Sequence, residues 1–217
     1  RDYINSHQLM VGLAALLAGI FIGHPTMSAP AVAVPPADAP PLFPFLFVTI
    51  ACGAISGFHG LVSSGTTSKQ LAKASDAQAV GYGAMLGEGL LALIATLAVG
   101  AGLGNFAEHY HAFPNAAQGV GLFVRGAAQF LVAIGIPQQP AQVLVAVLVI
   151  SFAATSLDTG VRIQRFIIAE LGEIWRVDAL QNRWVGGLIA VALPLGLYLL
   201  GHEGTLWPLF GASNQML

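Results

Sequence analysis

Charge is what this sequence has least of. Lys, Arg, Asp and Glu together make up only 8% of its 217 residues, whereas soluble domains carry about 25%. So few charges cannot keep a surface in water, which excludes a soluble globular domain, and the apolar share of 56% excludes a disordered chain. The single cysteine, Cys52, cannot form an internal disulfide, and no zinc-type Cys/His spacing is present. A net charge of −2 provides no basic surface, so nucleic acid is not an expected partner.

Long apolar stretches are what the sequence has instead. A bilayer core about 30 Å thick needs roughly 20 apolar residues in a helix. Five stretches satisfy or nearly satisfy this length, and a sixth begins at residue 206. The five are residues 8–23, 43–66, 80–103, 140–157 and 184–200. The sequence therefore predicts an all-α fold, a polytopic transmembrane helical bundle. We expect residues 1–217 to form part of a single transmembrane domain of a longer protein.

Basic residues alternate from loop to loop. Loops 67–78 and 158–183 carry lysine or arginine, whereas loops 24–42 and 104–118 carry neither. Because basic loops favour the cytoplasmic side of a membrane, the first two loops are expected inside and the other two outside.

Two further segments do not fit as simple spans. Residues 119–135 are short and carry Arg125, and counting them as a span would break the alternation of the loops. They are predicted to form a re-entrant or interfacial helix on the outer side. Residues 162–176 place apolar side chains at helical spacing between charges, which predicts an amphipathic helix on the inner surface.

The stretch 43–70 carries a polar face within an apolar span. Ser56, His59, Ser63 and Thr66 follow one another at spacings of 3, 4 and 3, so they share one side of a helix. Ser63-Ser64-Gly65-Thr66-Thr67 is the best candidate for a break in that helix, because an unwound membrane segment exposes backbone groups that hold ions and substrates. The alternative is a packing face of small residues whose hydroxyl groups bond back to their own helix.

Glu88 is the ninth residue of the span 80–103, which places it near the middle of the membrane. Intramembrane carboxyl groups are functional candidates because they are costly without partners. Glu88 could carry a proton or pair with His59 or an arginine. The alternative is a static buried partner that fixes helix packing.

A second polar stripe runs through residues 151–165. Ser151, Thr155, Asp158, Arg162 and Arg165 lie at spacings of 4, 3, 4 and 3. Hydroxyl and carboxylate oxygens suit Na⁺, so Thr155, with the neighbouring Ser156, is a candidate Na⁺ site. The alternative for Asp158 is an ordinary i,i+4 ion pair with Arg162.

Three segments resemble the carbon starvation A family of bacterial inner-membrane proteins. They are FPFLFVTIACGAISGFHGLVSSGTTSKQL (43–71), SLDTGVRIQRF (156–166) and LWPLFGASNQML (206–217). The resemblance implies a multi-pass protein of the bacterial inner (plasma) membrane, a secondary transporter that takes up peptides or pyruvate during carbon limitation. It also implies the broken-helix fold, often with inverted repeats, of the amino acid–polyamine–organocation superfamily.

The leading hypothesis is a cation-coupled symporter and not an enzyme. Its partners are the lipid bilayer and a peptide or small carboxylate substrate, with H⁺ or Na⁺ as the coupling ion and no other cofactor. One alternative is an intramembrane serine hydrolase using His59 and Ser63, which are four residues apart. Another is a membrane sensor that transports nothing. The sequence leaves peptide versus pyruvate, H⁺ versus Na⁺ and the oligomeric state open.

Overall fold

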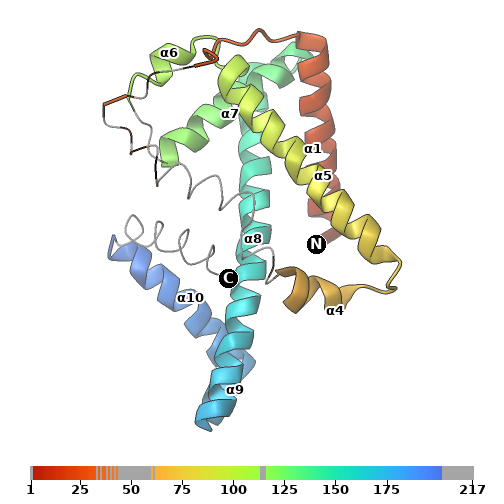
Figure 1. Cartoon of the computed structure of the whole chain (residues 1–217), viewed down its shortest axis with the longest axis vertical. Coiled ribbons are helices and arrows are strands. Elements are labelled where there is room, and N and C mark those ends of the chain that lie inside the picture. Colours follow the sequence, from red (N-terminus) through yellow and green to blue (C-terminus); the bar gives the residue numbers. More distant parts are fainter. Residues whose placement is uncertain are drawn as a thin grey trace. The chain divides into compact units, whose positions relative to one another are not determined.

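The computed structural model describes residues 2–32, 34, 36–37, 39, 41, 43, 60, 62–112 and 116–201. All regular structure in this part of the chain is helical, with no strand (Figure 1). Three of the described helical stretches are long and apolar enough to cross a membrane: Tyr3–Gly23, Asp76–Gly102 and Gln138–Trp175. The predicted all-α membrane fold is confirmed for the described residues.

The chain divides into two compact units. The first comprises residues 1–39 and 78–154, and the second comprises residues 40–77 and 155–217. The division falls within one helix, α8 (Gln138–Trp175), between Ala154 and Thr155.

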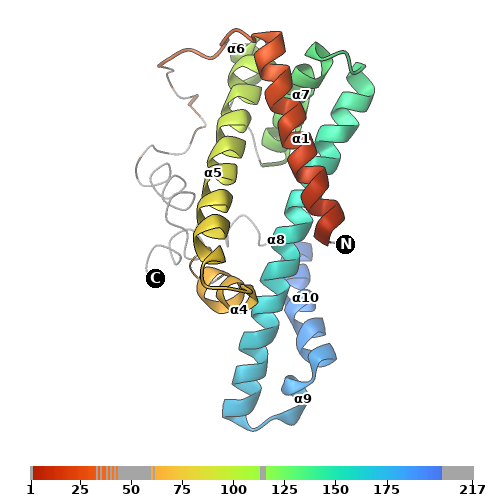
Figure 2. The same ribbon diagram turned by 90° about the vertical axis from the view of Figure 1, so that its right-hand side faces the viewer.

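The first unit is built on long apolar helices. Its elements are α1 (Asp2–Gly23), most of α5 (Asp76–Leu97), the π-helical turn η3 (Ala98–Gly102), the short α6 (Phe106–His109), α7 (Ala116–Ala133) and the first part of α8. α1 packs against α7 and against the first part of α8 (Figure 2). The core contains the fully buried Ile94, Phe130 and Val145, in one cluster with buried alanines of α7 and α8.

Small residues set how closely these helices approach. A Cβ added at Gly126 of α7 would collide with the backbone carbonyl of Ala98, and one at Gly102 would collide with the backbone of Gly126. On α1, a Cβ at Gly19 would meet the carbonyl of Phe130. Helices in lipid associate through this kind of close packing, because the lipid offers no hydrophobic driving force between them. α7 is therefore held by both α1 and η3.

The segment that follows α1 is hydrogen-bonded to η3. The backbone N–H groups of Ser28 and Ala29 both donate to the carbonyl of Gly100, at 2.8 and 3.0 Å. The Ser28 hydroxyl donates to the same oxygen at 2.8 Å. Gly100 lies in the last turn of its helix, where carbonyls have no partner within the helix, so this irregular segment supplies the missing donors.

A tight turn joins α7 to α8. Gly135 adopts a left-handed conformation with φ of 96°. Its N–H bonds to the Val132 carbonyl at 2.9 Å, and the Ile136 N–H bonds to the Leu131 carbonyl at 3.1 Å. These two bonds satisfy carbonyls at the end of α7 in the manner of a Schellman motif, so α8 starts directly afterwards at Gln138.

The second unit contains the rest of α8 and shorter elements. They are the π-helical turn η2 (Ser63–Thr67), α4 (Ser68–Gln70), α9 (Asp178–Gln181) and α10 (Arg183–Leu199). α8 ends where Arg176 adopts a left-handed φ of 57°. α10 starts at the N-cap Asn182, whose side chain accepts a hydrogen bond from the Trp184 N–H at 2.9 Å. Gly186 brings α10 close to Arg165 and Ile168 of α8.

Two predicted segments differ from the helices observed. Residues 140–157 and 162–176 were expected as a span followed by a separate surface helix, but α8 runs through both without a break. The charges that begin at Asp158 lower the hydropathy without interrupting the backbone hydrogen bonds.

Residues 119–135 fall largely in α7, an 18-residue helix with a buried face against α1 and η3. The span 43–66 and the stretch from residue 206 lie largely or wholly outside the described residues.

Candidate substrate and ion site

The segment expected to break is a widened helical turn. In η2 the N–H of Ser68 donates to the carbonyl of Ser63, five residues back, and the backbone leaves helical geometry only at Leu71. π-Helical turns of this kind are rare and occur often at functional sites. Residues 63–67 are therefore the point at which the regular α-helical hydrogen-bond pattern is interrupted.

The serine hydroxyls of this turn bond to their own helix. Ser63 Oγ donates to the Gly60 carbonyl at 3.0 Å, and Ser64 Oγ donates to the same carbonyl at 2.8 Å. Both side chains are exposed in the described chain. Each hydroxyl oxygen keeps lone pairs that can accept a bond from a ligand, so these local bonds are compatible with both the packing and the binding interpretation.

The structure describes only part of the remaining polar face predicted for residues 43–70. Ser56 and His59 lie outside the described residues. The backbone of Thr66 belongs to η2. The predicted alignment of these side chains on one helix face stays a prediction.

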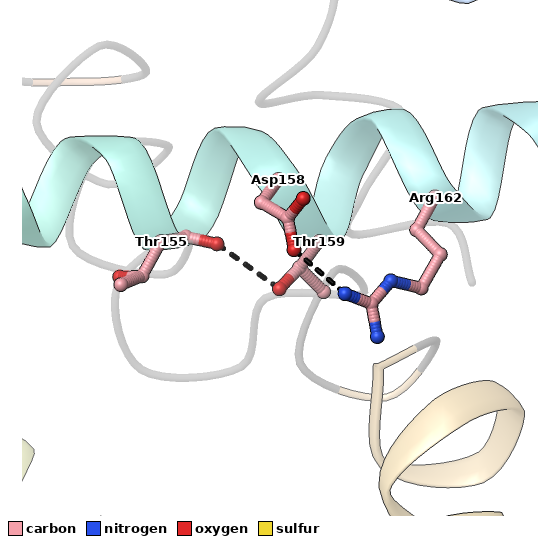
Figure 3. Close-up of polar contacts among 4 residues, drawn as sticks. All are labelled: Thr155, Asp158, Thr159 and Arg162. Carbon is pink, nitrogen blue, oxygen red and sulfur yellow. Dashed lines mark hydrogen bonds and ion pairs between the residues drawn. The ribbon is translucent and has the colours of Figure 1, made fainter. Parts of the chain in front are cut away.

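The polar stripe on α8 forms local contacts (Figure 3). Arg162 and Asp158 form an ion pair at 2.7 Å, with 70% of the Asp158 side chain and 42% of the Arg162 side chain exposed. The Thr159 hydroxyl donates to the Thr155 carbonyl at 3.1 Å. Thr155 is half-buried and Ser156 is exposed. Asp158 thus forms the i,i+4 pair with Arg162 that the spacing predicts as the alternative to cation binding.

Glu88 occupies an exposed position on α5. The glycines around it, at positions 81, 83, 87 and 89, have no atom within 4 Å of an added Cβ outside their own helix. Glu88 belongs to the first unit, whereas η2, Thr155 and Asp158 belong to the second.

A cavity of about 570 Å³ lies beside η2 within the second unit. Ser64 and Gly65 line it from η2, Lys69 lines it from α4, and Glu170 and Glu173 line it from α8. Its apolar wall consists of α8 side chains, among them Ile163, Phe166 and Ile167. By sequence alone, these charges are predicted to belong to an inner loop and to an amphipathic surface helix. By helical spacing, residue 170 shares one face with residues 163, 166 and 167. This pattern could have placed Glu170 beside the apolar side chains of α8.

A second polar cavity, of about 400 Å³, lies in the first unit. Glu108, His109, His111 and Arg125 line it. Close by, Phe106 and Tyr110 stack with ring centroids 4.4 Å apart, and burial raises the pKa of the Tyr110 hydroxyl. Within the described part of the chain, no group of three or more His, Cys, Asp or Glu side chains is arranged to hold a metal.

The long apolar helices define an all-α membrane protein, with polar cavities in each unit. The family model described as carbon starvation protein CstA matches residues 1–108 and 103–217, which together span the whole chain. The chain belongs to the carbon starvation protein CstA family. This confirms the resemblance inferred from the three sequence segments.

Named relatives share about a third of their residues with the chain. The peptide transporter CstA of Bacillus subtilis is 33% identical over 261 residues, and that of Escherichia coli is 32% identical over 282 residues. The pyruvate/proton symporter BtsT of Escherichia coli is 32% identical over 300 residues. Each alignment covers 100% of this chain but only 43%, 40% and 41% of the respective relative. No solved structure matches the chain.

Proposed function

We propose that the chain forms part of a secondary active transporter, a cation-coupled symporter that takes up peptides or small carboxylates such as pyruvate. The observation that carries this proposal is membership of the CstA family, whose relatives include named peptide transporters and a named pyruvate/proton symporter. The membrane in this proposal is the bacterial inner (plasma) membrane, since these relatives are bacterial and the helices are long enough to span a bilayer.

The widened turn η2 supports this proposal at the level of the site. A turn whose hydrogen bonds depart from the α-helical pattern can offer backbone oxygens to a ligand more readily than a regular helix can. In the proposed mechanism the substrate binds beside residues 63–67. A proton binds at Glu88 or His59, or Na⁺ binds at Thr155 and Ser156. These ligands shift the protein between outward- and inward-facing states only by binding the two states with different affinity.

The contacts of Ser63 do not favour hydrolysis. A serine nucleophile needs a general base that accepts its proton, and the Ser63 hydroxyl donates instead to the Gly60 carbonyl. The names of the relatives are also those of transporters. No observation favours a sensor without transport.

Uptake by the protein at its full natural length, reconstituted in proteoliposomes, tests the proposal. Labelled pyruvate and labelled dialanine are offered under an inward pH gradient and, separately, under an inward Na⁺ gradient. We expect accumulation of at least one substrate above its equilibrium level under one gradient, and loss of that accumulation when an ionophore removes the gradient. Protein-free liposomes are the control. If neither substrate accumulates under either gradient, the proposal is wrong.

A further inference from the structure

The cavity beside η2 carries charges of both signs. Lys69, Glu170 and Glu173 are among its lining residues. The two glutamates are three residues apart on α8, so they share one side of that helix. Lys69 comes from α4, a different element, so the fold itself brings the cation and the carboxylates to one cavity.

Two arginines of α8 have other contacts. Arg162 forms the ion pair with Asp158. The Arg165 guanidinium lies over the Phe166 ring, 5.6 Å from its centroid, and Arg165 lines a neighbouring cavity. The charges lining the cavity beside η2 are therefore one ammonium and two carboxylates, a net charge of −1.

This charge pattern discriminates between two kinds of ligand. A small monoanion such as pyruvate gains attraction from Lys69 but is repelled by two carboxylates. A zwitterion can place its carboxylate at Lys69 and its ammonium at Glu170 and Glu173. Because it carries no net charge, it is not repelled overall by the net negative charge of the site. Charge-assisted hydrogen bonds at both ends would fix its orientation.

The size and the wall of the cavity suit the same ligand. A volume of about 570 Å³ is within the range of small-molecule sites. Ile163, Phe166 and Ile167 line the cavity with apolar side chains, and Ser64 lines it from η2.

The geometry points to a binding site for a short zwitterion of about dipeptide size, held by Lys69 at its carboxylate and by Glu170 and Glu173 at its ammonium. This inference rests on the proposed transport function and assigns a site to it. The site selects ligands that carry a carboxylate and an ammonium group on one molecule over ligands that carry only one of these groups.

Competition with blocked analogues tests both charges. Uptake of labelled dialanine by the full-length protein is measured with three unlabelled competitors: dialanine, N-acetyl-dialanine, which lacks the ammonium, and dialanine amide, which lacks the carboxylate. We expect each blocked compound to compete about tenfold more weakly than dialanine, the effect of one lost charge contact.

Variants then assign each charge to a residue. Lys69→Gln should abolish the advantage of dialanine over its amide, and the double variant Glu170→Gln/Glu173→Gln should abolish its advantage over the N-acetyl compound. The matched controls Lys73→Gln and Glu108→Gln lie outside this cavity and should keep both advantages. A partly unfolded protein loses uptake of all compounds, but it does not change the ratio between competitors.

The outcomes separate this inference from the proposed function. Gradient-driven uptake of pyruvate with no uptake of dialanine would overturn the zwitterion site and leave the symporter standing. Equal competition by the blocked compounds, or unchanged ratios in the variants, would also overturn the site alone. Absence of any gradient-driven uptake would overturn both.

Discussion

At the scale of single residues, the Asp158–Arg162 pair has two distinguishable roles. As a surface ion pair it contributes less than about 1 kcal/mol, because solvent reaches 70% of the Asp158 side chain and 42% of the Arg162 side chain. We therefore expect Asp158→Asn to change the free energy of unfolding by less than that amount, measured by denaturant unfolding in detergent. Uptake should be unchanged if the only role of Asp158 is its ion pair with Arg162.

The double variant Asp158→Asn/Arg162→Gln is the control for this prediction. It removes both charges, so it should behave like the parent protein if the pair is merely local. If Asp158→Asn and the double variant both lose Na⁺-driven uptake while remaining folded, Asp158 is a cation ligand and the local interpretation fails.

Glu88 is one of the two residues at which the coupling proton is proposed to bind, and His59 is the other. Glu88→Gln keeps the size and shape of the side chain, but its amide cannot take up or release a proton. We expect this variant to exchange substrate across the membrane without accumulating it under a pH gradient. Counterflow and gradient-driven uptake, measured side by side, check this. Unchanged accumulation would remove Glu88 from the mechanism.

Residue-level reasoning from sequence succeeded where the partner is close along the chain. The Asp158–Arg162 pair and the back-bonded hydroxyls of Ser63 and Ser64 were both anticipated, though only as alternatives to binding. The grouping of Lys69 with Glu170 was not anticipated, because a hundred residues separate them and local spacing contains no information on that contact.

At the scale of elements, the approach of α7 to η3 depends on Gly126. Gly126→Ala would place a methyl group against the Ala98 carbonyl, and backbone cannot move aside cheaply. We expect a loss of about 3 kcal/mol in the free energy of unfolding, at the upper end for overpacking. Thermal unfolding monitored by size-exclusion chromatography measures the change.

Gly121→Ala on the same helix is the matched control. An added Cβ at Gly121 meets no atom within 4 Å, so the substitution changes stability only through the higher helix propensity of alanine. A gain of up to about 1 kcal/mol is expected. If both variants had the same stability, the close approach of α7 and η3 would not explain any destabilisation by Gly126→Ala.

The limits of sequence reasoning at this scale are clear in α8. Hydropathy detects where an apolar environment ends, but a helix continues as long as its backbone bonds and side-chain spacing permit. Asp158 and Arg162 end the apolar stretch and, as an i,i+4 pair, they also support the helix. The sequence therefore predicted a helical membrane span and a helical amphipathic stretch, but it did not predict their continuity.

At the scale of the whole molecule, composition and three segments were sufficient for the fold class and the family. An apolar share of 56% with 8% charge leaves few alternatives to a helical membrane protein. Which side of the membrane each loop occupies rests on the alternation of lysine and arginine. That topology stays a prediction.

Labelling of single cysteines tests the topology. In intact cells expressing a cysteine-free full-length background, His111→Cys should react with a membrane-impermeant maleimide. Lys73→Cys and Asp178→Cys should react only after permeabilisation, because both lie in segments rich in lysine or arginine that are expected on the inner side. Labelling of all three positions in intact cells, or of none, would contradict the predicted orientation.

The attachment of Ser28 and Ala29 to the Gly100 carbonyl has a consequence for amide exchange with solvent. Residues 24–30 have no regular structure, so their amide hydrogens would ordinarily exchange with deuterium within seconds. Two of them are instead held by an oxygen at the end of η3, and they can exchange only when that contact opens. Deuterium incorporation at these two amides therefore reports on how often the segment separates from η3, a helical turn about seventy residues further along the chain.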